Sequence, residues 1–118
     1  MLIVAVNSDA GVRQLKGPHR PVIDQESRAA MLAALACVDH VLIFDEPTPH
    51  ELLRAIQPHV LVKGGTYRAD EVVGREVVEA YGGTVRVLGE VAGISTTRIL
   101  ASVEDTVQVH SERSQCLH

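Results

Sequence analysis

Leu2-Ile3-Val4-Ala5-Val6-Asn7-Ser8-Asp9 is the stretch that decides the fold. Its first five residues form a continuous apolar run rich in β-branched side chains, which is typical of a strand buried on both faces of a parallel sheet. The polar residues that follow favour caps and turns, so we expect the strand to end there. Since no basic segment precedes the run, it indicates a strand and not a signal peptide.

Further strands and helices are expected to alternate along the rest of the chain. Apolar runs predict strands over 41–44, 60–62 and 84–88. Cap and stop residues predict four helices. They run from Asp24 to about Cys37, from Thr48 through Ile56 with Pro58 beyond the end, from about Asp70 to Tyr81, and from Ser95 to about Val107. Thr48 and Glu51 have the spacing of a capping box. The segment 13–21 is basic and holds a glycine and two prolines, so we expect a loop there.

This alternation indicates an α/β fold, with a parallel sheet and helices on both of its faces. The 118 residues suit one domain, which we assign to 1–108, followed by a polar tail at 109–118. The polar clusters follow predicted strands. In such folds ligands bind at the carboxyl ends of the strands, so the clusters are the candidate functional residues.

Composition excludes several classes of protein. Hydrophobic residues make up 46% of the chain, which is enough for a core. The formal charge of -4 argues against a nucleic-acid-binding surface. No apolar run is long enough for a membrane span. Cys37 and Cys116 lack metal-ligand spacing and the histidines are scattered, so we expect no protein-bound metal and a reducing, cytoplasmic compartment.

The cluster Gly93-Ile94-Ser95-Thr96-Thr97-Arg98 carries the clearest chemical signal. Small hydroxyl residues at a helix start offer free backbone N–H groups, hydroxyls and the positive end of the helix dipole, which together can hold phosphate oxygens. Arg98 adds a fixed charge. The alternative is an ordinary helix cap, because Ser and Thr favour that position in any case.

Two further clusters could bind an anionic ligand. Lys63-Gly64-Gly65-Thr66-Tyr67 directly follows a predicted strand, and its glycines would let a ligand approach the backbone closely. Lys16 and Arg20 form a small basic group on the Gly/Pro loop, which could clamp a phosphate. The alternatives are a flexible turn with a solvated lysine in the first case and a solvated basic loop in the second.

Arg28, Asn7 and Asp9 are weaker candidates. Arg28 lies on the apolar stripe of its predicted helix and therefore needs a carboxylate or a ligand phosphate as its partner. Glu26 is two residues away and does not face it on a helix. Asn7 and Asp9 could bind a hydroxyl or a base, or could simply end the strand.

Taken together, the clusters resemble one family. The resemblance rests on motifs in the family's order and spacing: Val4 to Asp9, Leu15-Lys16-Gly17, Arg20-Pro21, Glu26-Ser27-Arg28, Leu61 to Tyr67 and Ser95-Thr96-Thr97. They resemble the adenylyltransferase domain of bacterial heptose-phosphate enzymes, within the cytidylyltransferase-like superfamily. The resemblance implies a Rossmann-like nucleotidyltransferase fold and a reaction in which ATP and a heptose 1-phosphate give ADP-heptose and pyrophosphate.

The resemblance also implies roles for individual residues. Lys16 would be the catalytic cation that neutralises charge near the reacting phosphates. The nucleotide and the sugar phosphate would be held by Ser95, Thr96 and Thr97 at the triphosphate, Arg28 at a phosphate, Asn7 and Asp9 at the border of the site, and Lys63, Gly65 and Tyr67 along the pocket. Mg²⁺ would arrive with the triphosphate and keep mostly water ligands.

The chain departs from the family pattern in two places. It has Thr66 where the family usually has Asp, which could weaken a ligand contact. It also begins after the family's first strand–helix unit, which carries a His-x-Gly-His motif and whose strand lies in the middle of the sheet. We therefore expect little or no activity from the chain alone, and oligomerisation across the incomplete sheet. The alternatives are a CTP-dependent relative that acts on another phosphorylated acceptor, and a catalytically impaired nucleotide-binding or interaction module.

Overall fold

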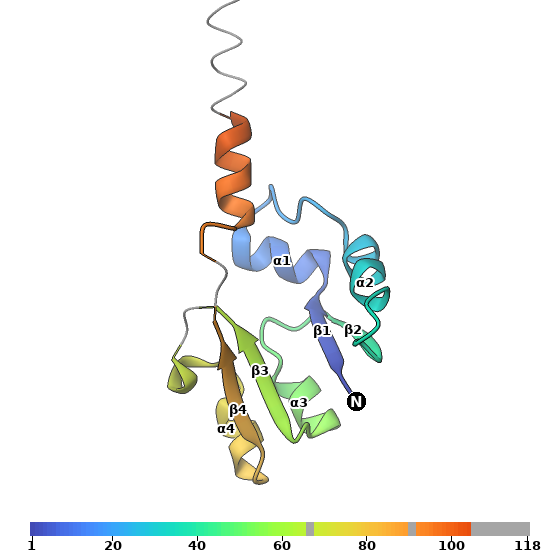
Figure 1. Ribbon diagram of the computed structural model, residues 1–118, viewed down its shortest axis with the longest axis vertical. Coiled ribbons are helices and arrows are strands. Elements are labelled where there is room, and N and C mark those ends of the chain that lie inside the picture. Colours follow the sequence, from blue (N-terminus) through green and yellow to red (C-terminus); the bar gives the residue numbers. More distant parts are fainter. Residues whose placement is uncertain (66–67, 90–91, 105–118) are drawn as a thin grey trace, which may run out of the picture.

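The computed structural model describes residues 1–65, 68–89 and 92–104 (Figure 1). Its strands are β1 (Ile3–Asn7), β2 (His40–Phe44), β3 (Val60–Gly64) and β4 (Thr84–Leu88). Its helices are α1 (Asp9–Lys16), α2 (Gln25–Ala33), α3 (His50–Ile56) and α4 (Arg75–Ala80), with a 3-10 turn at Ala69–Glu71 and a last helix over 96–104. At least one helix lies between each strand and the next, and the paired strands are parallel, so the predicted α/β class is confirmed.

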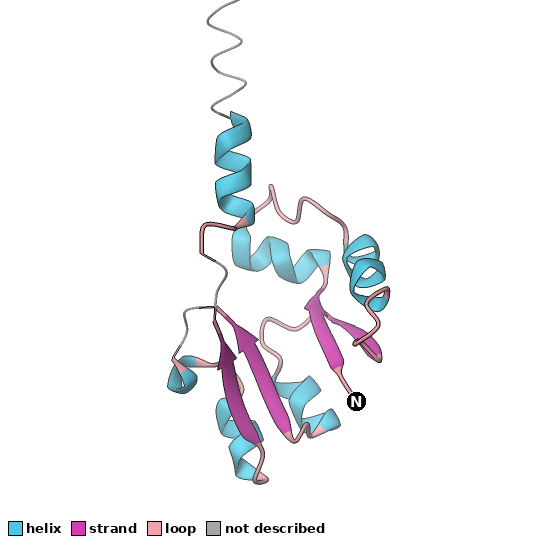
Figure 2. Ribbon diagram, viewed as in Figure 1, coloured by secondary structure: helices cyan, strands magenta, loops and turns pink. Residues whose placement is uncertain are grey.

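The strands form two parallel pairs. β1 pairs with β2 from Ile3 opposite His40 to Asn7 opposite Phe44. β3 pairs with β4 from Val60 opposite Thr84 to Gly64 opposite Leu88. Between these two pairs, the described strands share no ladder. The arrowheads of β1, β3 and β4 point toward the end of the molecule where α1 and the helix 96–104 lie (Figure 2).

The apolar core lies in the β3–β4 pair and the helices packed against it. Its buried members are Leu53 of α3, Val72, Val78 of α4 and Val85 of β4. Val78 is completely inaccessible to solvent. In the other pair, α2 packs against β1 and β2, but no hydrophobic side chain of the described residues 1–44 is fully buried.

Helix α1 corrects the prediction that a loop begins at Arg13. Ser8 caps this helix, since its Oγ accepts a hydrogen bond from the N–H of Gly11 at 3.1 Å. The helix then continues through Lys16 and ends at Gly17, whose φ of 93° is in the left-handed region that favours glycine. Asn7-Ser8-Asp9 therefore ends a strand, as predicted, and also starts a helix.

Three other predicted helices differ from the structure at their ends. Asp24 caps α2 as predicted, but this helix ends at Ala33 and not near Cys37. α3 has Pro49 at its N-cap with no side-chain cap, so the capping box predicted at Thr48 is wrong; the Thr48 hydroxyl contacts the Nδ1 of His50 instead. The helix expected from Asp70 is interrupted, because Gly74 adopts a φ of +91° before α4 begins.

Some sequence predictions fall outside the described residues. These are the roles of Thr66 and Tyr67, the helix end near Val107, and the boundary between 1–108 and 109–118. The start of that last helix is confirmed: Ser95 Oγ accepts a hydrogen bond from the N–H of Arg98 at 3.2 Å.

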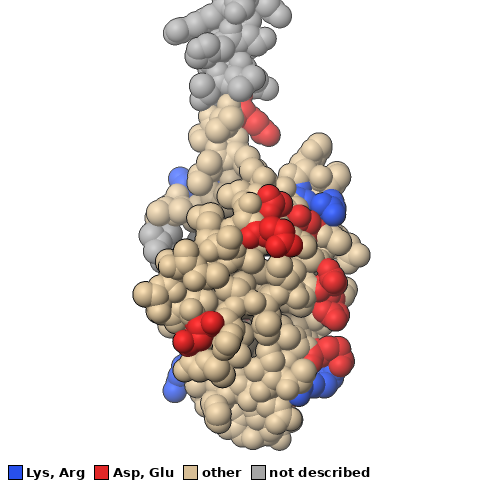
Figure 3. Space-filling model, turned by 90° about the vertical axis from the view of Figure 1, so that its right-hand side faces the viewer, with Lys and Arg blue, Asp and Glu red and all other residues tan. Residues whose placement is uncertain are grey.

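The surface of the described chain is mixed in charge. The face in Figure 3 shows separate acidic and basic groups and no broad basic area. In the part of the chain that the structure describes, no helix is long and apolar enough to cross a membrane.

Candidate functional site

One hydrogen bond joins the predicted basic loop to the hydroxyl-rich helix start. Nη2 of Arg20 donates to Oγ1 of Thr97 at 3.0 Å, although 77 residues separate them in the sequence. This contact places the segment after α1 against the first turn of the helix 96–104, and the end of α1 lies beside the start of that helix in Figure 1. Two of the sequence clusters are thus brought together.

The three hydroxyl residues at the helix start have different surroundings. Ser95 caps the helix, and Thr97 accepts the hydrogen bond from Arg20. Thr96 is exposed, and its side chain makes no hydrogen bond to any described residue. Its hydroxyl is therefore available to a ligand, whereas a ligand would have to share the other two with the protein.

Gly93 lies close to Arg98 in the same segment. A Cβ at Gly93 would stand 3.4 Å from Nη1 of Arg98, and the φ of this glycine is 84°. The guanidinium group therefore lies over the backbone that leads into the helix. Arg98 and Arg20 give the helix start two cations in addition to its dipole.

Lys16 is exposed at the last position of α1. A tight turn follows it, in which the N–H of Arg20 donates to the carbonyl of Gly17 at 3.3 Å. Lys16 therefore lies one turn from the residue that contacts Thr97. Its role in charge neutralisation stays a prediction.

The end of β3 supplies Lys63 and Gly65. Lys63 is exposed, and the N–H of Gly65 donates to the carbonyl of Leu88 at 3.1 Å, which extends the β3–β4 pairing by one bond. Gly65 has a φ of 117°, and a Cβ at Gly64 would meet no atom of the described residues within 4 Å. The chain reaches the helix 96–104 a few residues after the carboxyl end of β4.

Arg28 has a protein partner that the sequence did not reveal. Its Nη2 donates to Oδ1 of Asp9 and to the carbonyl of Asn7, both at 2.9 Å, and its Nε donates to the carbonyl of Ile23 at 3.0 Å. Asp9 is 19 residues away from Arg28, so local spacing could not identify it. The expectation that Arg28 contacts a phosphate stays a prediction.

Gln25 was not among the predicted site residues. Its Oε1 accepts the backbone N–H of Asp9 at 2.9 Å, so α2 reaches the first residue of α1 at two points. A glutamine three residues before an arginine on a helix was the only available signal, because that spacing puts both on one face.

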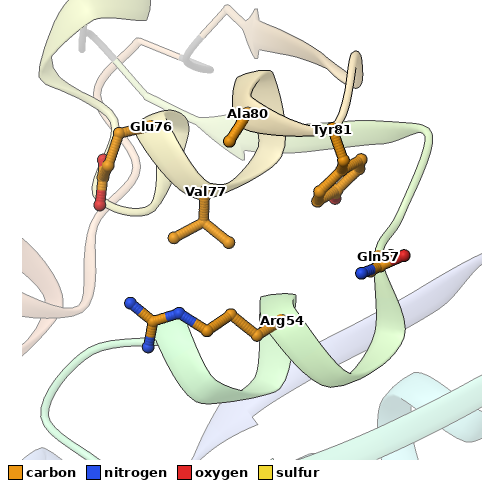
Figure 4. Close-up of a pocket in the computed structure, with 6 residues that line it drawn as sticks. All are labelled: Arg54, Gln57, Glu76, Val77, Ala80 and Tyr81. Carbon is orange, nitrogen blue, oxygen red and sulfur yellow. The ribbon is translucent and has the colours of Figure 1, made fainter.

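A hollow of about 380 Å³ lies elsewhere, between α3 and α4 (Figure 4). It is lined by Arg54, Gln57, Glu76, Val77, Ala80 and Tyr81. Its lining includes the residues just before β3 and β4 begin, which is the amino end of those strands. Ligands of parallel α/β folds bind at the opposite end, so we do not assign this hollow to the candidate site.

Comparison with known proteins identifies what the chain is similar to. The family model for cytidylyltransferase-like proteins matches residues 1–102. The bifunctional protein HldE of Geobacter sulfurreducens is 54% identical over 103 residues, which cover 87% of this chain and 21% of that protein. The HldE proteins of Syntrophotalea carbinolica and Pseudomonas entomophila are 50% and 55% identical over 105 and 102 residues, covering 89% and 86% of this chain and 21% and 22% of theirs. The chain thus spans about a fifth of the length of these relatives.

Proposed function

Because this chain belongs to the cytidylyltransferase-like family, we propose that it takes part in nucleotidyl transfer from ATP to a sugar 1-phosphate. The acceptor that we propose is a heptose 1-phosphate, and the products are ADP-heptose and pyrophosphate. The observation that carries the proposal is the contact between Arg20 and Thr97, since it joins a basic loop to a helix start that is rich in hydroxyls.

A triphosphate needs several donors and cations that converge on it. The helix start offers backbone N–H groups, the Thr96 hydroxyl and the positive end of the helix dipole. Arg20 and Arg98 bring fixed charge to the start of this helix, and Lys16 lies one turn before Arg20 in the chain. In this proposal Thr96 and its neighbours Ser95 and Thr97 hold the triphosphate.

The other strand ends would receive the rest of the two substrates. Asn7 and Asp9 lie at the end of β1, where they would border the nucleotide or sugar. Lys63 and Gly65 lie at the end of β3, where the missing Cβ of the glycine would allow close approach to the backbone.

The proposed reaction is a displacement at phosphorus. An oxygen of the sugar phosphate forms a bond to the α-phosphorus of ATP, while the bond from that phosphorus to the leaving pyrophosphate breaks. Lys16 would balance the negative charge that collects on the phosphates, and the helix start would fix the triphosphate in line with the acceptor. Mg²⁺ is expected to enter as part of the substrate complex.

Titration calorimetry and a pyrophosphate-release assay test this function. We expect purified chain to bind Mg·ATP more tightly than Mg·CTP, and Lys16→Met and Thr96→Val each to weaken that binding about tenfold or more, the loss expected for a charged or buried hydrogen bond. Arg86→Met, an exposed change on β4, is the matched control for Lys16→Met. Binding that both site variants leave unchanged would overturn the proposed site.

A catalytically impaired nucleotide-binding module is the second candidate. The observation that favours it is the separation of the described strands into two pairs, which leaves the polar groups of the site on two sheets. ATP binding without pyrophosphate release would support this candidate, and steady turnover by the isolated chain would exclude it. Preference for CTP would instead indicate the CTP-dependent alternative.

We also propose that the chain forms a homo-oligomer that covers the unpaired strand edges. Each described strand has one neighbouring strand, so both outer edges of each pair offer backbone N–H and C=O groups to a further strand. Sedimentation velocity over a hundredfold range of concentration tests this. A species that remains monomeric throughout would contradict it.

A further inference from the structure

We propose that Gln25 and Arg28 of α2 form a positioning clamp, which fixes the junction between β1 and α1 and thereby the placement of the candidate anion site. The proposal rests on the proposed function and adds positioning residues to it. Neither residue is required to touch a substrate. The clamp would act through residues 7–9, which join the end of β1 to the first turn of α1.

The contacts of the clamp with the junction reach two residues, Asn7 and Asp9, which flank Ser8. Gln25 accepts the N–H of Asp9, and Arg28 donates to the Asp9 carboxylate and to the carbonyl of Asn7. All three contacts measure 2.9 Å and are partly buried. Ser8, which lies between the other two, is 2% exposed and caps α1. The clamp therefore forms hydrogen bonds with both backbone and side-chain groups of the junction.

The geometry of α2 suits it to this role. Gln25 and Arg28 are three residues apart and so lie on one face of the helix. Asp24 caps that helix by accepting the N–H of Ser27 at 2.8 Å, which fixes the first turn that carries both residues. The planar guanidinium group contacts three acceptors, an arrangement that the single ammonium of a lysine cannot reproduce.

The sequence predicted the same role for Asn7 and Asp9, but the contacts of the clamp differ between these two residues. The Asp9 carboxylate forms an ion pair with Arg28, and both side chains are 24% exposed. Asp9 is thus committed to the protein, whereas the side chain of Asn7 has no hydrogen bond to a described residue. α1 leads from this junction to Lys16 at its far end, so a shift at Asp9 would be carried along a rigid helix to the proposed catalytic cation.

Gln25→Met and Arg28→Lys are the test variants, because each keeps the size or charge of the side chain but removes contacts of the clamp. The matched controls are Gln14→Met on the exposed surface of α1 and Arg86→Lys on β4. In amide hydrogen exchange we expect each test variant to speed exchange about fivefold or more along the whole of α1, which is the factor for losing one net hydrogen bond. Exchange in α4 should be unchanged. Faster exchange at Asp9 alone, with the rest of α1 unaffected, would overturn the positioning role.

The second readout is Mg·ATP affinity, measured at a temperature where circular dichroism shows every variant fully folded. We expect a loss of about fivefold for each test variant and none for the controls. If the unaltered chain binds no nucleotide, the proposed function fails and the exchange result alone decides the clamp. If nucleotide binds equally well to all variants while exchange in α1 rises, the clamp is structural only and its part in the site is refuted.

Discussion

The β3–β4 half of the molecule (50–88) buries Leu53, Val72, Val78 and Val85, whereas the β1–β2 half (1–44) buries no hydrophobic side chain fully among its described residues. The β1–β2 half is held instead by directional contacts, such as those of Ser8 and Arg28. Apolar burial stabilises without fixing direction, and hydrogen bonds fix direction for a small net gain. We therefore infer that the β3–β4 half supplies most of the stability, whereas the hydrogen bonds of the β1–β2 half place the residues of the proposed site.

The largest expected effect is loss of the apolar core. Leu53 is 5% exposed, and Leu53→Ala should lower the free energy of unfolding by about 2–5 kcal/mol through lost burial and a residual cavity. The control is Leu35→Ala, because Leu35 is 51% exposed and lies in the β1–β2 half. Urea denaturation followed by circular dichroism gives both values. Equal losses at the two positions would remove the contrast between the halves.

Gly74 offers a sharper probe of packing around Leu53. A Cβ at Gly74 would stand 2.3 Å from Cδ1 of Leu53, and the φ of this glycine is +91°. Gly82 has a φ of +88° but nothing within 4 Å of its Cβ position, so Gly82→Ala carries only the left-handed cost of about 1–2 kcal/mol. Gly74→Ala should cost about 1–3 kcal/mol more than that control, because Leu53 must move. A difference near zero would mean that the core rearranges freely.

In the β1–β2 half, we expect the hydroxyl of Ser8 to contribute to the free energy of unfolding. Ser8→Ala removes the cap of α1 and should lower the free energy of unfolding by about 1 kcal/mol. Ser27→Ala is the control, since Ser27 is exposed and, among the described residues, its hydroxyl hydrogen-bonds only to the Asp24 carboxylate, at 3.1 Å. We expect a loss of less than about 0.5 kcal/mol there. Thermal unfolding compares the two. A larger loss at Ser27 would contradict the assignment of Ser8 as the stabilising cap.

The sequence predicted elements well where local chemistry decides them. Strand β4 was predicted at 84–88 and found there, and Asp24 caps α2 as expected. It failed at α1, because Asn7-Ser8-Asp9 was interpreted only as a strand end, and at Gly74, where a left-handed residue delays α4. The family resemblance is confirmed by the match over residues 1–102.

Contacts of the candidate site show where sequence reasoning stops. That Arg28 requires a partner follows from its place on an apolar stripe, but Asp9 can be identified only once β1 and α2 are packed together. The same holds for Arg20 and Thr97, which 77 residues separate. The resemblance implied that Lys16 and Thr97 act on the same phosphates, and the structure shows that Arg20, on the loop after Lys16, makes the contact with Thr97. Gln25 carries no charge and belongs to no motif, so its spacing from Arg28 was the only sequence signal, and the structure supplies its contact with Asp9.

The smallest expected effect is on the pH dependence of stability, because each half has a carboxyl group with a lowered pKa. A hydrogen bond from the N–H of Ser27 lowers the pKa of Asp24 in the β1–β2 half below its usual 3.8. In the β3–β4 half, the backbone N–H of Glu76 and then the His50 side chain lower the pKa of Glu76 below its usual 4.5. Because a lowered pKa favours the charged form in the folded chain, each carboxylate stabilises at pH values above its unfolded pKa. That contribution is lost as the pH falls through the folded pKa.

Asp24→Asn and Glu76→Gln test this in parallel, since each keeps a side chain of similar shape but cannot titrate. We expect each variant to show a slightly shallower fall in the free energy of unfolding below about pH 4.5 than the unaltered chain. Asp24→Asn should in addition show no difference in slope between pH 6 and pH 8, because hydrogen bonds and no charge pair lower the pKa of Asp24. Both groups are solvent-exposed. High salt should weaken the effect only where nearby charges contribute to it, and that is at Glu76, whose pKa is also lowered by the charges of His50 and Arg54. Salt sensitivity at Asp24 and none at Glu76 would reverse this assignment. It would mean that a nearby charge lowers the pKa of Asp24 and that hydrogen bonds alone lower the pKa of Glu76.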